Sequence, residues 1–256
     1  MSIRTADTSR IRNRVAAKSS VTSGHFRLWS LAYRILDMEG HTDMTQGHLT
    51  IRDPAGRGFW IKRTGIAFSE VRGSKDFVLV DLSGKRIAGI GGVHGEWPIH
   101  AEIFRSRPDV NAIGHTHPFY ACVFSACREP LRGVTHEGAG LDGTVSRYTD
   151  TSNLINTPQL GRDVAKALGA APAVLMRNHG ITFVGRTVEE CVLAGIFLER
   201  ACHAQLVAAA SGFAWEYPDE REMRQKYQTV MTPAYIRNSW EFYLRKLTNR
   251  EAGKAV

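Results

Sequence analysis

The sequence predicts an α/β sandwich, in which a mostly antiparallel central sheet is flanked by helices, as a single domain over residues 1–256. Between residues 47 and 83, short strand-like runs follow one another with only turn residues between them, which favours antiparallel pairing over βαβ repeats. From about residue 98 onward, helical patterns alternate with further apolar strands. No repeat, linker or low-complexity tract divides the sequence, and its length is sufficient for one large core.

Each element has its own signal in the sequence. The polar, arginine-rich residues 1–22 lack the apolar core of a secretory signal, and we expect a flexible arm or short helix there. A helix ending at Gly40 is predicted next, with apolar residues on one face at positions 28, 31, 32, 35 and 36. Strands are predicted at 48–52, 59–62 and 76–81, the first two joined as a hairpin. Helices are predicted at about 98–107, 118–127, 158–169, 187–211 and 219–247.

Composition narrows the class of protein. No apolar run approaches the roughly 18 residues needed to span a bilayer, so no membrane partner is expected. The four cysteines form no C-x-x-C pair, which is typical of a reduced, cytoplasmic protein. The formal charge of +8 comes from dispersed basic residues without a nucleic-acid motif. An anionic small-molecule substrate accounts for it more simply than a nucleic acid.

The stretch from Gly114 to Pro118 carries the clearest chemical signal. An apolar run, Val110 to Ile113, leads into it as a buried strand. Because side chains alternate along a strand, His115 and His117 project to the same side and form half of a metal site. Taken alone, a His-x-His pair is more often two hydrogen-bonded structural histidines, so a third ligand and an acid or base are needed.

Both are present elsewhere in the sequence. An apolar strand that begins at Ala173 ends in His179 and Gly180, and Gly180 allows a backbone turn that leaves the histidine at the strand tip. Three histidines with an open fourth position are typical of catalytic metal sites. Glu96 precedes the helix that Pro98 opens, where its carboxylate is either a general acid/base or a solvated charge favoured by the helix dipole.

Taken together, these residues resemble the class II aldolase/adducin family. The matching motifs cover most of the sequence, from about Leu31 to Cys202, and run in order: Glu96-Trp97-x-x-His100, Ser106-Arg107-Pro108-Asp109-Val110-Asn111-Ala112, His115-x-His117 and Asn178-His179-Gly180. The resemblance implies the same sandwich architecture. It also implies that His115, His117 and His179 bind a divalent metal ion, Mn²⁺ or Zn²⁺, and that Glu96 is an acid/base able to approach the metal.

The sequence departs from the sugar-phosphate aldolases of this family at their phosphate site. Those enzymes bind phosphate through a Gly-Asn pair, a Thr-Gly pair and two serines. The corresponding positions here are Gly47-His48, Thr64-Gly65 and His94-Gly95. The Thr-Gly pair is retained, whereas His48 replaces the asparagine and His94-Gly95 replaces the serines. We expect these residues to line the substrate site, and the replacements argue against phosphate as the group bound.

A second departure concerns the proton donor. The aldolases use a tyrosine downstream of the second metal histidine, and ungapped counting places His136 at that position. A histidine transfers protons near neutral pH, so His136 is a candidate catalytic residue. A buried structural imidazole is an equally good interpretation.

These departures, with the run from Gly95 to His100 and Ser125-Ala126-Cys127, resemble more closely the family's decarboxylases of hydroxylated pyridine or benzene dicarboxylates. The resemblance implies a metal-dependent carbon–carbon lyase of aromatic catabolism, in which Glu96 or His136 protonates the ring carbon. Lys62 and Arg63, which precede Thr64-Gly65, are candidates to hold a second carboxylate, since arginine offers a planar bidentate fork. Arg177, beside the strand of the third ligand, is a weaker candidate. For Lys62 and Arg177 we favour the alternative, a surface charge.

Two other functions stay open at this point. A metal aldolase or epimerase acting on a hydroxy sugar or its phosphate would use the same metal residues. An adducin-like interaction module is disfavoured, because such relatives lose metal ligands that this sequence retains. The resemblance further implies a homo-oligomer, a cyclic tetramer, in which a C-terminal tyrosine reaches a neighbouring site. Tyr235 is the candidate, and it is equally a packing aromatic.

Overall fold

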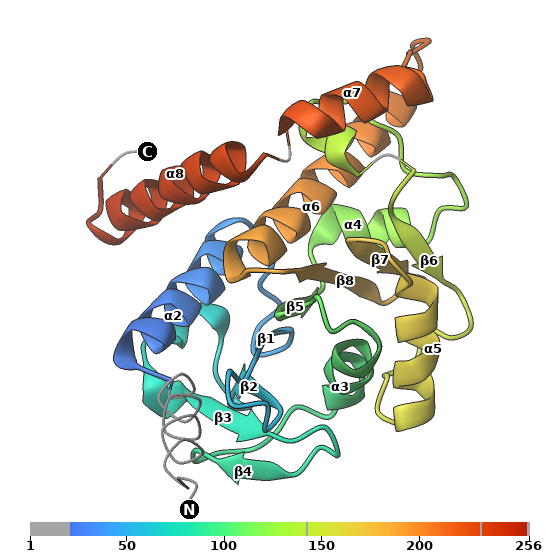
Figure 1. Ribbon diagram of the computed structural model, residues 1–256. Coiled ribbons are helices and arrows are strands. Elements are labelled where there is room, and N and C mark those ends of the chain that lie inside the picture. The colour runs from blue at the N-terminus through green and yellow to red at the C-terminus, as the bar shows by residue number, and fades with distance from the viewer. Residues whose placement is uncertain (1–20, 142, 231, 255–256) are drawn as a thin grey trace, which may run out of the picture.

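Eight strands form one sheet in the order β4-β3-β2-β1-β5-β8-β7-β6, in a computed structural model that describes residues 21–141, 143–230 and 232–254 (Figure 1). Every neighbouring pair is antiparallel except β6 and β7, which are parallel. The predicted mostly antiparallel sheet is therefore confirmed. The strands are β1 (His48–Arg52), β2 (Phe59–Lys62), β3 (Phe77–Val80), β4 (Arg86–Ala88), β5 (Ala112–Thr116), β6 (Ser146–Tyr148), β7 (Ala173–Met176) and β8 (Gly180–Gly185).

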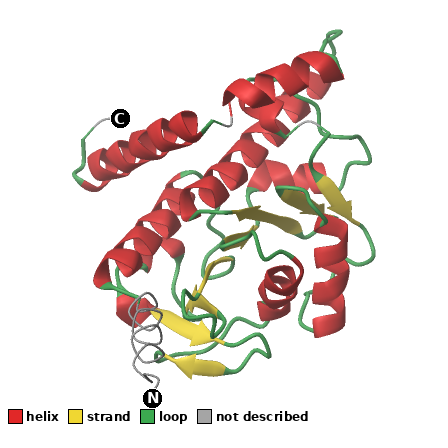
Figure 2. Ribbon diagram, viewed as in Figure 1, coloured by secondary structure: helices red, strands yellow, loops and turns green. Residues whose placement is uncertain are grey.

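Helices cover both faces of this sheet (Figure 2). One layer contains α2, α6 and α8, and the other contains α3 and α5. The helices are α2 (Ser23–Met38), α3 (Trp97–Ser106), α4 (Phe119–Ser125), α5 (Pro158–Leu168), α6 (Val188–Ala210), α7 (Glu220–Val230) and α8 (Pro233–Glu251), with 3₁₀ turns η1 (Phe68–Glu70), η2 (Ser74–Asp76) and η3 (Glu137–Gly140). This is the α/β sandwich that the sequence predicts.

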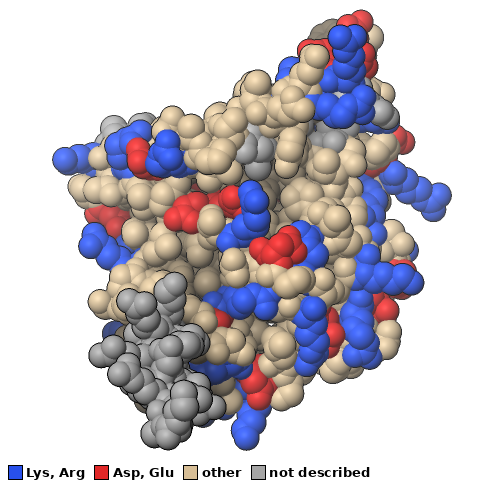
Figure 3. Space-filling model, in the orientation of Figure 1, with Lys and Arg blue, Asp and Glu red and all other residues tan. Residues whose placement is uncertain are grey.

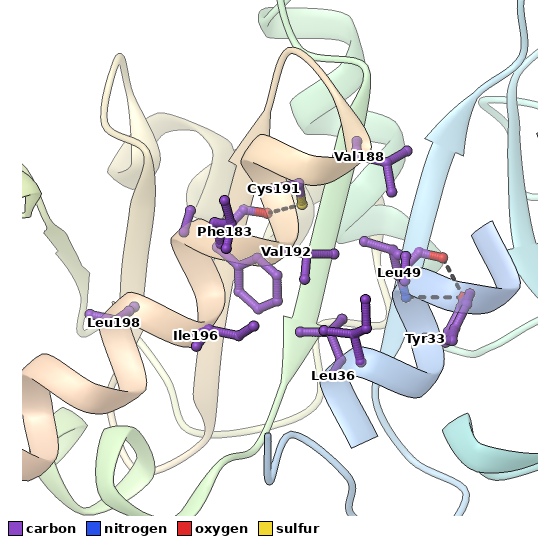
Figure 4. Close-up of a cluster of buried hydrophobic side chains, with 14 of the residues drawn as sticks. Tyr33, Leu36, Leu49, Phe183, Val188, Cys191, Val192, Ile196 and Leu198 are labelled. Atoms are coloured by element: carbon purple, nitrogen blue, oxygen red, sulfur yellow. Dashed lines mark hydrogen bonds between the residues drawn. The ribbon is translucent and has the colours of Figure 1, made fainter. Parts of the chain in front are cut away.

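The apolar strands are buried on both faces because their side chains alternate between two cores. Leu49 and Leu175 pack toward α2 and α6, whereas Ile113 and Val174 pack toward α3 and α5. Figure 4 shows the first core, where the hydroxyl of Tyr33 accepts a hydrogen bond from Leu49 N (3.1 Å) and donates one to Leu49 O. The same hydroxyl accepts from Lys62 N (3.1 Å), which ties α2 to the edge of the sheet where β1 begins and β2 ends.

The predicted C-terminal helix 219–247 is wrong as one element. The structure has two helices there, α7 and α8. Pro233 has no N–H to continue a helix from before it, and it is accommodated as the first residue of α8, whose N-cap Thr232 accepts from Tyr235 N (3.2 Å). The predicted arm, residues 1–22, lies outside the described residues except for its last two, of which Thr22 is the N-cap of α2.

The sequence predicts no apolar segment long enough to span a membrane, and the described residues include one helix that meets this criterion. Within the described part of the chain, α6 is long and apolar enough to cross a membrane by length and composition. However, 61% of its most apolar window is buried inside the fold, as in a core helix, so this is weak evidence for a membrane span. In the face shown in Figure 3, basic and acidic side chains are interspersed rather than separated into patches.

Candidate metal centre

Antiparallel pairing brings the candidate site together where the central strand β1 begins and its neighbours β2 and β5 end. β1 runs against both β2 and β5, so its first residue lies beside their last ones, and His48 is directly opposite His115. His117 lies just past the end of β5, and His179 lies in the short connection between β7 and β8. Glu96 is the N-cap residue of α3, which packs on the same face.

The four predicted residues converge. The side chains of Glu96, His115, His117 and His179 offer ligand atoms that all lie within 4.8 Å of one another. Glu96 Oε2 is 3.5 Å from His115 Nε2, and Glu96 Oε1 is 3.4 Å from His179 Nε2. The Nε2 atoms of His115 and His117 are 3.2 Å apart.

These separations fit a metal ion. Four ligand atoms at about 2.1 Å from a tetrahedral zinc ion lie about 3.4 Å apart, close to the three distances above. The tautomer of His115 also fits, because a carbonyl only accepts: Nδ1 donates to Ile181 O (3.0 Å), which leaves the Nε2 lone pair for a metal. His115, His117 and His179 would hold the ion, and Glu96 would complete the fourth position or act as acid/base beside it.

Two backbone features explain why the third ligand motif reads Asn-His-Gly. Asn178 has a φ of 55°, a left-handed conformation that asparagine tolerates better than most residues. The sharp turn therefore occurs at Asn178, whereas the sequence predicts it at Gly180. Gly180 is needed for space instead, because a Cβ there would lie 2.5 Å from Cδ2 of His117.

The protonation states suit metal binding. Burial lowers the pKa of His117 to about 3, with His115 and His179 adding to the effect, so its ring is neutral. For Glu96, burial by itself raises the pKa. The adjacent imidazoles of His115 and His179 outweigh burial and hold the pKa well below its ordinary value. Glu96 is consequently a carboxylate at neutral pH and accepts a proton before it can donate one.

A second group of buried polar residues lies beside the metal centre. His48 Nδ1 is 2.6 Å from His100 Nε2, and His100 Nδ1 is 2.7 Å from Thr50 Oγ1. The rings of His48 and His115 are 5.2 Å apart, and those of His48 and His94 are 4.9 Å apart. Burial is the largest cause that lowers the pKa of His48, His94 and His100, so all three are neutral. The structure thus brings the predicted residues His48 and His94 to the site.

The expectation that Lys62 is a surface charge is wrong. Lys62 is fully buried, and its Nζ contacts Thr45 O (2.8 Å), Ile66 O (3.0 Å) and His94 Nε2 (3.3 Å). The sequence gives little warning, since a lysine in a strand is usually exposed. Arg177 is exposed, as expected.

The other predicted substrate residues border the same region. Arg63 follows Lys62 and is partly exposed. Its Nε lies 4.0 Å from Oδ1 of Asp76. Thr64 N donates to Gly92 O (3.1 Å), which joins this segment to the glycine-rich loop before His94. Gly65 and Gly95 are exposed, and a Cβ at either position would meet open space.

His136 and Tyr235 are not brought to the metal group within this chain. His136 is exposed at the N-cap of η3, so its interpretation as a buried structural imidazole is wrong. Tyr235 is on α8, with its ring 6.2 Å from that of Phe197. Among the described residues, neither makes a hydrogen bond, ion pair or ring contact with Glu96 or the three metal histidines.

The family model for the class II aldolase and adducin N-terminal domain matches residues 29–206, well over half of the sequence and all of the metal group. This chain belongs to that family. It is 30% identical over 206 residues to 3,4-dihydroxyphthalate decarboxylase from Arthrobacter keyseri, covering 74% of this chain and 81% of the relative. It is 32% identical over 185 residues to decarboxylase NovR from Streptomyces niveus, covering 70% and 67%.

A solved structure with an aldolase name shares nearly the whole fold. L-fuculose 1-phosphate aldolase from Glaciozyma antarctica is 28% identical, with a TM-score of 0.75 over 94% of this chain and 98% of that one. Both decarboxylases and aldolases are therefore among its relatives. The protein is a lyase-family member with a possible metal site, and the comparisons leave decarboxylation and aldol cleavage as alternatives.

Sequence reasoning missed Asp43. Its Oδ2 lies 3.3 Å from Nδ1 of His117, a charge contact without hydrogen-bond geometry, so the carboxylate lies behind that ring. Asp43 lies in the connection between α2 and β1, far from the histidines in sequence. No spacing rule points to it, because contacts of this kind depend on how a loop folds back over a strand.

Proposed function

We propose that this protein is a metal-dependent decarboxylase, a carbon–carbon lyase acting on a hydroxylated aromatic carboxylate or dicarboxylate. The observation that carries the proposal is the convergence of His115, His117 and His179 with the carboxylate of Glu96, beside the buried rings of His48 and His94. The likeness to 3,4-dihydroxyphthalate decarboxylase and to decarboxylase NovR supports an aromatic carboxylate as the substrate class.

The chemistry assigns a role to each group. His115, His117 and His179 would hold a divalent ion, whose positive charge would stabilise the negative charge that develops on the substrate. Glu96 takes the proton of the ring hydroxyl and delivers it to the ring carbon that carries the carboxylate. The bond to that carboxylate then breaks and CO₂ leaves. The electron pair returns through the ring to the hydroxyl oxygen, which regains a proton from water.

The geometry explains why Glu96 suits this proton transfer. Its Oε1 accepts a hydrogen bond from Ile155 N (2.8 Å), which fixes the carboxylate between His115 and His179. Its lowered pKa keeps it ionised, so it can accept a proton before it donates one, the order that the reaction needs. We assign the proton transfer to Glu96. His136 is the second candidate, and it would have to act from its exposed position on η3.

The test is CO₂ release from hydroxylated aromatic mono- and dicarboxylates, with protein stripped of metal and then reloaded with Mn²⁺ or Zn²⁺. We expect release from at least one compound, and only with metal present. Both metals suit histidine and carboxylate ligands, so the assay also decides which is used. No release from any compound with either metal would overturn the proposal.

A class II aldolase or epimerase acting on a hydroxy sugar or sugar phosphate is the second candidate. The observation that favours it is the likeness over nearly the whole chain to an L-fuculose 1-phosphate aldolase structure. The same preparation would then cleave a ketose phosphate to an aldehyde and leave the aromatic panel untouched.

Assembly and location complete the proposal. We propose a cytoplasmic homo-oligomer, a cyclic tetramer, acting on an anionic small molecule without a nucleic-acid or membrane partner. In such an assembly, Tyr235 and His136 would be available to the site of a neighbouring copy, because neither reaches the metal group in its own chain. Light scattering of the purified protein tests the assembly directly.

A further inference from the structure

Helix α4 connects the loops that carry two of the metal residues. Its N-cap residue, Pro118, directly follows His117. At the other end of the helix, Oγ of Ser125 accepts a hydrogen bond from Asn178 N (3.1 Å), and Asn178 directly precedes His179. One short helix therefore contacts two ligand-bearing loops that are far apart in the sequence.

Both ends of α4 are fixed to the rest of the fold. Glu199 of the core helix α6 accepts from the first turn through its two carboxylate oxygens, from Tyr120 N (3.0 Å) and from Ala121 N (2.7 Å). At the last turn, the guanidinium of Arg147 donates to Ser125 O (3.3 Å). An acidic side chain at the start and a basic one at the end also complement the helix dipole. The helix is thus a fixed support for whatever it contacts.

His179 depends on such a support more than the other two metal residues do. The ring of His115 is oriented by its own Nδ1, which donates to Ile181 O (3.0 Å), and the Asp43 carboxylate lies 3.3 Å from Nδ1 of His117. Among the described residues, Nδ1 of His179 has neither a hydrogen bond nor an ion pair, although it is buried. The direction of this ring is therefore set by the backbone that carries it.

That backbone has an unusual conformation. Asn178 has a φ of 55°, and left-handed residues of this kind persist where their surroundings hold them. Here His179 N donates to Met176 O (3.0 Å), while Asn178 N donates to Ser125 Oγ. Cys122, also on α4, adds a weaker contact from its Sγ to His179 O (3.7 Å). The Ser125 hydroxyl thus provides the shorter of these two contacts between α4 and the turn.

A serine at the end of a helix has a simpler role as well. Its hydroxyl often donates to a carbonyl one turn back, and Ser125 does so with Cys122 O (2.7 Å). Ser106, the last residue of α3, makes the same contact with Ile103 O (3.2 Å). Within the described part of the chain, Ser125 differs by accepting from Asn178 N in addition. Ser106 is therefore a natural comparison, because it has the helix-end contact without the link to a metal residue.

We propose that Ser125 is a positioning residue of the metal centre: its hydroxyl holds the turn at Asn178 and thereby sets the direction of the His179 ring. This inference rests on the metal centre of the proposed function and not on the reaction catalysed there. Ser125 is almost fully buried and acts through the backbone of Asn178, so its effect should be on metal affinity and coordination geometry.

The experiment compares metal-stripped wild type, Ser125→Ala and Ser106→Ala. Competition with a chelator measures Zn²⁺ affinity, and the visible absorption of bound Co²⁺ reports the number and arrangement of its ligands. We expect Ser125→Ala to bind Zn²⁺ at least about tenfold more weakly and to change the Co²⁺ spectrum, as loss of support for a metal ligand does. Ser106→Ala should match the wild type in both measurements. Thermal unfolding of the metal-free proteins shows that each variant is folded.

A second variant tests the turn without altering α4. Asn178→Ala places a residue that tolerates the left-handed conformation less well at the same position, so it should weaken Zn²⁺ binding and change the Co²⁺ spectrum too. Because both changes act on one turn, the double variant with Ser125→Ala should lose less affinity than the product of the two single losses. Asn178→Ala also keeps the proposal testable if Ser125→Ala does not fold.

Two results would overturn the inference. One is either variant, Ser125→Ala or Asn178→Ala, binding Zn²⁺ as the wild type does with an unchanged Co²⁺ spectrum. The other is an equal loss of affinity in Ser125→Ala and Ser106→Ala, which would leave Ser125 with the helix-end role alone. A wild-type protein that binds neither ion would overturn the metal centre together with this inference. Absence of CO₂ release from a protein that binds both ions would overturn the proposed reaction alone, so the two failures can be told apart.

Discussion

Two groups of three histidines lie side by side in this protein, and they differ in what their nitrogens contact. In the metal group, Nε2 atoms of His115, His117 and His179 face one another and the carboxylate of Glu96. In the second group, made of His48, His94 and His100, rings are joined to each other, to Thr50 or to Lys62. In the metal group the ring nitrogens converge on one point. In the second group the ring nitrogens contact other protein side chains.

This difference indicates that the first group binds a metal ion and the second group lines the site. Imidazole nitrogens that converge with a carboxylate within a few ångströms are an arrangement that a bound cation satisfies. Linked neutral rings whose nitrogens already contact other protein groups cannot bind a cation in the same way, so they line the site without holding the ion. Residue type alone does not distinguish the two groups. The strands and loops that carry them do.

The largest expected effect is on the metal group. His115→Ala should abolish metal binding and lower activity by at least about a thousandfold, because the ion loses the ligand that Ile181 O holds in the correct tautomer. Metal content by mass spectrometry and turnover are the measurements. His136→Ala is the matched control, since it removes an exposed imidazole outside the group and should retain metal. Full activity in a metal-free His115→Ala protein would contradict the assigned site.

Glu96→Gln should separate binding from chemistry. The amide is the same size as the carboxylate but cannot accept the proton, so kcat should fall about 10²- to 10⁴-fold with metal content retained. His136→Gln should lower kcat less than about tenfold, because His136 lies away from the metal group in its own chain. The opposite ranking of the two variants in steady-state kinetics would transfer the proton-donor role to His136.

The sequence predicted the residues on strands and in motifs better than those whose surroundings are formed by distant loops. Strand periodicity predicted β1, β2 and β3 and the common direction of His115 and His117, because alternate side chains of a strand point to one side, but it missed the short strands β4 and β6. Glu96 and His179 came from the ordered family motifs, and the structure brings both to the two histidines. Lys62 and Asp43 escaped because their surroundings are formed by loops distant in sequence. The break between α7 and α8 was missed although Pro233 signals it, since the helical pattern continues on both sides.

Lys62 should also give the protein a pH-dependent stability. Its pKa is about 8 when folded, below the value of about 10.4 for an unfolded lysine, so the unfolded chain binds more protons between those values. Stability should therefore rise with pH in this window, by about 2 kcal/mol between pH ~8 and pH ~10. Because tyrosines and cysteines also titrate there, the quantity to measure is the difference between wild type and Lys62→Met in urea unfolding. Parallel curves for the two proteins would mean that Lys62 is solvated as well when folded as when unfolded.

The smallest effect concerns the carboxylate behind His117. Asp43→Asn keeps the size of the side chain but removes the negative charge behind His117, and we expect a loss of about tenfold in metal affinity. A chelator competition should show that loss, while kcat at saturating metal stays near the wild-type value, because Asp43 contacts no reacting group. Glu216→Gln, a change at an exposed carboxylate, should leave metal affinity unchanged. If Asp43→Asn lowered kcat and left metal affinity intact, Asp43 would belong to the proton transfer rather than to the support of a ligand.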